Sequence, residues 1–298
     1  MKFLSIVTIG FMIVSCNSKP VIPATATLWQ PGVVSSQAPE FSITFNSTMT
    51  EVYFNRTTPD RSSMQIMTSR LDGGKWSEPT ALPFSTGEYK DVDPFLLSNG
   101  SRLIFSSDRP KTPGDQSGNW DTWFLDKTNA GWSNPINAGA PLNSDSAEIY
   151  ISIAESGNAY FVSERDGIRG VKISRFENGA WQETESIILK LRGEPIYAGN
   201  PCISADETFL ITAVRDPEGN QTPDLFISRN ENGQWSELEN LGPKVNHPNY
   251  ADFAPALSKD NEILFFTSER PGVLPEQAEG VRPPGDIYWV SLASVFDM

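Results

Sequence analysis

The chain has 298 residues, a formal net charge of −14 and one histidine. Such an acidic surface argues against binding to nucleic acid or to anionic lipid. A single histidine also excludes a metal site built from two histidines and leaves any Ser-His-Asp triad dependent on His247, in a loop next to Pro248. We expect no catalytic residues.

The first 15 residues are expected to be a signal peptide. Their apolar run is too short for a membrane-spanning helix and ends on Ile13-Val14-Ser15-Cys16. A small residue directly before a cysteine resembles the bacterial lipoprotein box, which implies that Cys16 is lipidated. The alternative is an ordinary signal peptide with an incidental Cys16. Asn17, which is not an aspartate, implies sorting to the outer membrane, facing the periplasm or the cell surface.

The residues after this signal divide into two parts. Residues 16–26 are polar and contain proline, so we expect a short tether, and residues 27–298 are long enough for one domain with a large core. The membrane is then contacted only through the lipid anchor, and the protein is expected to be a monomer. Cys202 lies alone in an apolar stretch, which predicts a buried structural thiol and no intrachain disulfide.

The stretch from Asp93 to Ser144 predicts a four-stranded antiparallel blade. Pro94–Ser98 and Leu103–Ser106 are apolar strands joined by Asn99-Gly100, a dipeptide that favours tight hairpins. Asp121–Asp126 is the third strand. Trp132–Ile136 is the fourth, and its proline places it at an edge because proline cannot donate to a ladder.

The same pattern recurs about every 50 residues, which indicates a propeller built from repeated blades. The fourth-strand tryptophan returns, and it is expected to pack between blades: Trp76, Trp132, Trp181 and Trp235. The second strand repeatedly ends near an arginine: Arg56, Arg109, Arg165, Arg215 and Arg270. The third strand repeatedly opens with an acid: Asp121, Asp224 and Asp286.

These repeats resemble the WD40-like β-propeller repeat family, of the type found in the Tol-system TolB propeller. The resemblance rests on the Ser-x-Asp/Asn-Gly turn, the Ser-Asp/Glu-Arg strand end, the Asp-Ile-Tyr strand start and the Gly-Pro-x-x-Asn crossover, and it spans most of the chain. It implies a fold and leaves the function open. Two blades depart from it, with Asn55-Arg56 in the first and Gly170-Val171 in the third.

The ends of the chain predict how the ring closes. Leu28–Val33 reads as a fourth strand without its blade, whereas the last blade stops after a third strand at Asp286–Ser291. An unpaired strand edge is avoided in native proteins, so the two ends are expected to share one blade. The fold class predicted is therefore all-β, a five-bladed β-propeller with four antiparallel strands per blade.

The repeated arginines are interpreted as structural, because a residue copied in every blade usually serves the blade. We expect them to pair with acids such as Asp121, Asp224 or Asp286, or with a neighbouring blade.

Residues just before or at the start of each inner strand are expected to meet at one mouth of the central channel. The acids and amide are Glu40, Asp91, Asp93, Glu148, Asn200 and Asp252. The accompanying tyrosines are Tyr89, Tyr150, Tyr197 and Tyr250. Crowded carboxylates either raise their pKa values or hold a cation, and Ca²⁺ is the expected ion. The alternative is that these residues cap strands.

Two functions remain open at this point. The first is a non-enzymatic module of the envelope that binds a protein or a glycan, and the scarcity of reactive side chains supports it. The second is a carbohydrate-active enzyme resembling a glycosidase, since carboxylates at a channel mouth beside aromatic rings also suit sugar hydrolysis. Carboxylates about 5–10 Å apart across an open pocket would favour hydrolysis. Carboxylates paired with arginines would favour a structural role.

Overall fold

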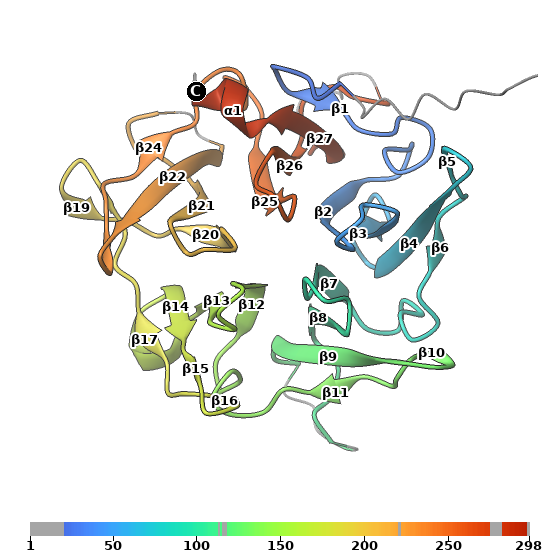
Figure 1. The fold of residues 1–298 in the computed structure, drawn as a ribbon, viewed down its shortest axis with the longest axis horizontal. Helices are drawn as coiled ribbons and strands as arrows, with labels where there is room; N and C mark the ends of the chain where they lie inside the picture. The colour runs from blue at the N-terminus through green and yellow to red at the C-terminus, as the bar shows by residue number, and fades with distance from the viewer. Residues whose placement is uncertain (1–20, 113, 115–117, 220–221, 275–281, 297–298) are drawn as a thin grey trace, which may run out of the picture.

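The computed structural model describes residues 21–112, 114, 118–219, 222–274 and 282–296. Its five sheets of four or five strands are arranged as blades around a central axis, as Figure 1 shows. The protein is a five-bladed β-propeller, which confirms the predicted fold class. The predicted signal peptide and Cys16 lie outside the described residues.

The first two blades share one topology, with the inner strand first in sequence and the outer strand split into two short pieces. Blade 1 contains β2 (Glu40–Phe45), β3 (Glu51–Thr57), β4 (Met64–Asp72), β5 (Lys75–Trp76) and β6 (Thr80–Ala81). Blade 2 contains β7 (Asp91–Leu96), β8 (Arg102–Ser107), β9 (Asp121–Thr128), β10 (Gly131–Trp132) and β11 (Ile136–Asn137). The split differs from the continuous fourth strand expected over Trp132–Ile136, because residues 133–135 span only two residues of β9, which interrupts the pairing as a bulge does.

Blade 3 follows the same order with added hairpins, and blade 4 repeats the topology of the first two blades. Blade 3 contains β12 (Glu148–Ile153), β13 (Ala159–Ser163), β14 (Gly170–Ser174) and β17 (Glu185–Ser186), with a 3₁₀ turn at Arg165–Gly167. Two hairpins accompany it, β15 (Phe176–Glu177) with β16 (Ala180–Trp181), and β18 (Lys190–Leu191) with β19 (Glu194–Pro195). Blade 4 contains β20 (Gly199–Ile203), β21 (Phe209–Val214), β22 (Asp224–Glu231), β23 (Gln234–Trp235) and β24 (Glu239–Asn240).

Blade 5 is made from both ends of the chain, as predicted. Its strands are β25 (Asp252–Leu257), β26 (Ile263–Ser268), β27 (Asp286–Ser291) and, from the N-terminal side, β1 (Thr27–Leu28). In β1, Leu28 pairs with Tyr288, and the next residue, Trp29, donates its N–H to the Ile287 carbonyl at 2.8 Å. Figure 1 shows β1 beside β27, and the short helix α1 (Leu292–Val295) follows directly after β27.

Apolar side chains fill the spaces between the blades. Trp29 of blade 5 lies edge-on to Trp76 of blade 1 at 5.4 Å between ring centroids. Trp132 of blade 2 contacts Tyr53 of blade 1 at 6.0 Å, and Trp235 contacts a tyrosine of blade 3 in the same way. These contacts confirm that repeated tryptophans pack between blades. Across the described residues, no helix combines the length and apolar character that a membrane crossing needs.

Each inner strand carries a bulge near its start, where one residue adopts a left-handed backbone conformation. The five residues, one per blade, are Ser42 (φ 49°), Asp93 (φ 55°), Tyr150 (φ 61°), Asn200 (φ 48°) and Ala254 (φ 47°). Each bulge interrupts the pairing register between the first and second strands. The bulges turn these five side chains toward the axis, where all five line the same cavity.

Candidate functional site

The first residues of four inner strands are buried carboxylates, and each is paired with an arginine of its own blade. Their exposed fractions are 0 to 1%. The pairs are Arg56 Nε to Glu40 Oε1 at 2.8 Å, Arg165 Nη2 to Glu148 Oε1 at 3.0 Å, Arg270 Nη2 to Asp252 Oδ1 at 2.7 Å, and Arg109 with Asp91. Four of the five repeated arginines are therefore structural, but their partners are these acids, and not the third-strand acids that the sequence suggested.

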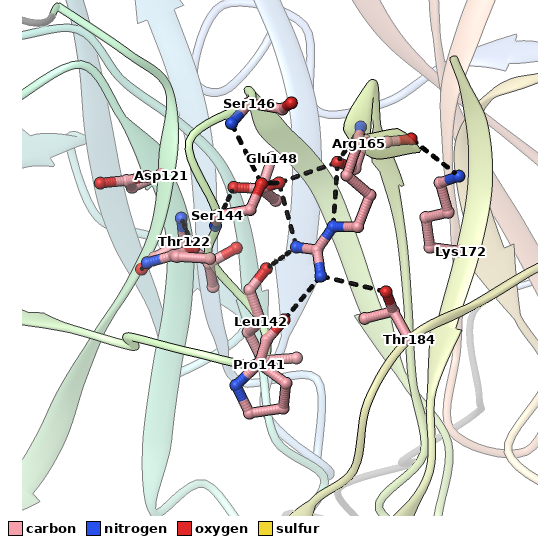
Figure 2. A network of polar contacts seen from close by, with 12 residues as sticks. Asp121, Thr122, Pro141, Leu142, Ser144, Ser146, Glu148, Arg165, Lys172 and Thr184 are labelled. Carbon is pink, nitrogen blue, oxygen red and sulfur yellow. Dashed lines mark hydrogen bonds and ion pairs between the residues drawn. The ribbon is translucent and has the colours of Figure 1, made fainter. Parts of the chain in front are cut away.

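Figure 2 shows how completely one of these pairs is satisfied. Glu148 accepts hydrogen bonds from the backbone N–H of Ser144 at 2.9 Å and from the hydroxyls of Ser144 and Ser163 at 2.6 and 2.8 Å. Arg165 also donates to the Leu142 carbonyl at 2.7 Å. The pair thus ties the inner strand of blade 3 to the crossover loop that arrives from blade 2.

Blade 4 departs from this arrangement. Asn200 occupies its left-handed bulge position, so the residue two places earlier, Ala198, stands where the other blades have an acid. Arg215 is exposed and makes no ion pair with any described residue. Asn200 therefore belongs with the residues that face the axis, and not with the buried acids among which the sequence placed it.

An axial cavity of about 280 Å³ lies among the five inner strands. Of the ten residues predicted for the channel mouth, three line it: Asp93, Tyr150 and Asn200. The three remaining tyrosines lie elsewhere. Tyr89 is 5.4 Å from the guanidinium of Arg109, Tyr197 is 4.7 Å from that of Arg169, and Tyr250 contacts His247 at 4.9 Å.

Asp93 is the predicted acid that the arginines leave free for the cavity. Its side chain is 6% exposed, and its backbone N–H donates to Asn55 Oδ1 at 2.7 Å. Burial raises the pKa of Asp93 to about 7, against a smaller lowering by a hydrogen bond from Ser42. Burial, and then the charge of Asp93, raise the pKa of Tyr150. Near neutral pH the cavity thus holds a carboxyl group that carries a proton in much of the population.

Two arginines that the sequence did not single out lie near Tyr150. Arg61 and Arg282 both approach Glu269 Oε1, at 3.6 and 2.6 Å. The charge of Arg282 lowers the pKa of Arg61, after burial, and it also influences Tyr150. Both arginines lie in loops without a repeated motif, so no sequence signal pointed to them.

The expectation of Ca²⁺ depended on unpaired carboxylates around one opening. The pairing of Glu40, Asp91, Glu148 and Asp252 with arginines removes that premise for these four residues. Within the described ranges, no group of three or more His, Cys, Asp or Glu side chains is placed to hold a metal ion.

No family model and no curated protein sequence matches the chain. Among solved structures, it is similar to a GH43 endo-arabinanase from Bacillus licheniformis, with 14% identity, a TM-score of 0.54, and coverage of 87% of this chain and 96% of that one. An α-L-arabinofuranosidase from Podospora anserina, determined with cellotriose, gives 11% identity, a TM-score of 0.52 and coverage of 91% and 98%.

TolB from Acinetobacter baumannii is a further structural neighbour, with 15% identity and a TM-score of 0.48. The match covers 86% of this chain but spans only 55% of the A. baumannii chain. At such identities the comparisons establish a shared propeller fold, and the function must be argued from the side chains of this chain.

Replacing Arg165 with methionine should lower the free energy of unfolding by about 3–5 kcal/mol, because it leaves Glu148 buried without a partner. Arg175→Met is the matched control, since Arg175 and Glu185 form an exposed pair at 3.4 Å and should contribute less than about 1 kcal/mol. Urea denaturation measures both. Equal losses in the two variants would show that the buried pair has no special role.

Asp93 should make stability depend on pH. Its folded pKa of about 7 exceeds the ordinary value of 3.8, so the folded state binds the proton more tightly. This contribution to stability is therefore complete below about pH 4 and is lost as the pH rises to about 7. Asp93→Asn should match the wild type at pH 4 and exceed its stability by up to about 4 kcal/mol at pH 8. A difference between the two that stays constant across this range would contradict the assignment.

Proposed function

We propose that this chain is a lipid-anchored β-propeller of the bacterial cell envelope that binds a protein or glycan partner at the axial cavity without cleaving it. The proposal rests on where the predicted carboxylates lie and what they pair with. Four of the five predicted carboxylates are held by arginines inside the blades, and Asp93 alone of that set lines the cavity.

The scarcity of buried carboxylates in the cavity supports binding over hydrolysis. Among the described lining residues, the only other carboxylate is Glu155, which lies beyond the end of β12. Glu155 lies in the turn after β12, where its side chain is 57% exposed and 3.9 Å from the ammonium of Lys259. A glycosidase pairs two carboxylates across the scissile bond, and Asp93 is the buried one of these two.

The lining suits recognition of a hydroxyl-rich or peptide ligand. Tyr150 offers a ring and a hydroxyl, Asn200 offers an amide, and Asp93 can donate a hydrogen bond when it is protonated. These groups come from three blades whose backbones are fixed by ladder pairing, so little conformational entropy is lost when a ligand binds.

A glycosidase is the second candidate, and the raised pKa of Asp93 favours it. A buried carboxyl group with a pKa of about 7 is suited to act as a general acid near neutral pH. The fold is shared with enzymes that are named as acting on arabinose-containing glycans. Glu155 would be the second carboxylate, and it would have to approach Asp93 when a substrate binds.

Glycan arrays and calorimetry with arabinan, xylan and cello-oligosaccharides, run beside affinity capture of envelope proteins, test both candidates. For a ligand found there, Tyr150→Ala and Asn200→Ala should each weaken binding by roughly tenfold or more, whereas Ile136→Ala, on the outer strand of blade 2, should not. If the wild type releases reducing sugar from one of these glycans and Asp93→Asn does not, the protein is a hydrolase and not only a binding module. A ligand indifferent to both cavity variants would place its site elsewhere.

The anchor is tested separately. Cys16→Ser should move the protein from the membrane fraction to the soluble periplasm and remove an acyl mass increment from the mature chain. Membrane association that persists in the variant, with no acylation of the wild type, would contradict lipidation.

A further inference from the structure

A second cavity, of about 190 Å³, lies in blade 3 away from the axis. It is bounded by β14, by residues 186–189 that follow the outer strand, and by residues 195–198 that lead into blade 4. None of its lining residues lines the axial cavity. The two cavities are therefore separate sites, although the charges of Arg169 and Tyr197 act on Tyr150 of the axial cavity.

The floor of this cavity is a lysine where the other blades have a large apolar residue. Lys172 is the third residue of β14, a position held by Trp123, Phe226 and Tyr288 in blades 2, 4 and 5. In those three blades the strand also opens with an aspartate, whereas β14 opens with Gly170. Within the first three residues of this strand, blade 3 therefore lacks the acid of those three blades and has a base that they do not have.

Lys172 is buried without a carboxylate partner. Its side chain is 1% exposed, and its ammonium group donates to Ser186 Oγ at 2.8 Å and to the Arg165 carbonyl at 3.4 Å. Within the described part of the chain, no acidic side chain forms an ion pair with it. A buried cation is costly unless it is paired, and this one retains a donor for an additional acceptor.

The opening of the cavity is partly apolar and carries a second cation. Ile168, Ile188 and Tyr197 line it and are 54%, 52% and 41% exposed, although large apolar side chains are seldom exposed in this protein. The Arg169 guanidinium lies 4.7 Å from the ring centre of Tyr197. Its partner Glu164 lies at 3.2 Å, but the Arg169 side chain is itself 53% exposed, so the guanidinium remains accessible to a ligand.

We propose that this cavity binds a carboxylate group attached to an apolar body. The carboxylate accepts hydrogen bonds from Lys172 and Arg169, and the apolar body covers Ile168, Ile188 and Tyr197. The C-terminal residue of a peptide and a small branched organic acid share this chemistry. Inorganic phosphate would satisfy the cations but would leave the apolar rim exposed.

Calorimetry on the full chain with N-acetyl-leucine and with its neutral amide provides the test. The acid should bind at least tenfold more tightly than the amide. Lys172→Met should abolish this preference, and the variant should fold because apolar residues occupy the same position in other blades; far-UV circular dichroism and the melting temperature confirm folding. Lys190→Met, on the exposed hairpin β18–β19, is the matched control and should bind as the wild type does.

The source of the carboxylate is resolved by comparing N-acetyl-leucine with a tripeptide that ends in free leucine. Tighter binding of the peptide indicates a protein C-terminus, and equal binding indicates a small acid. Asp93→Asn should leave both affinities unchanged. Binding of inorganic phosphate as tightly as the acid, equal binding of acid and amide, or no binding at millimolar concentration would each overturn the proposal.

Discussion

A carboxylate removed from water must meet a positive charge and several hydrogen-bond donors, and four blades of this propeller are organised around that constraint. The arginine that ends the second strand pairs with the acid that opens the first. It also reaches the chain arriving at the blade, through the carbonyls of Val33, Leu142 and Val245 in three cases. One side chain therefore fixes the inner strand, the second strand and the crossover together. Because blades contact one another through their apolar faces, this polar link sets where each blade begins.

The same constraint explains why much of the fold could be predicted from the sequence while the site was predicted only in part. Turn dipeptides, alternating strands and the repeated tryptophans are local signals, and they recur often enough to define the blades and the shared closure by β1. The partners of the arginines are not local. Arg109 is closer in sequence to Asp121 than to Asp91, which is its partner, and only the packed blade determines which carboxylate loses its water and needs the guanidinium.

The residues that face the axis could not be predicted from the sequence, for a different reason. Alternation along an ideal strand assigns every second residue to one face, but the bulge in each inner strand shifts that assignment by one left-handed residue. Ser42, Asp93, Tyr150, Asn200 and Ala254 share a backbone conformation and no chemical type, so no motif marks them. The buried acids do share a chemical type, so the sequence pattern singled them out, although they form ion pairs inside the blades.

Positions where one blade differs from the others are informative. The residue that most blades share shows what the structure of a blade requires, so a different residue needs a separate explanation. In blade 4, Ala198 stands where the other blades have the acid, and the strand register puts Asp216 where blades 2, 3 and 5 have the arginine, so the pair is absent and Asp216 pairs with Arg192 instead. In blade 3, Gly170 stands in place of the acidic strand start and Lys172 adds a buried base, which forms no ion pair among the described residues although the charge of Asp166 acts on it. A substitution that only relaxed the repeat would leave an apolar residue at Lys172, as at Phe226. Retaining a desolvated ammonium beside an exposed apolar rim costs stability, and a bound anion is the direct way to offset that cost.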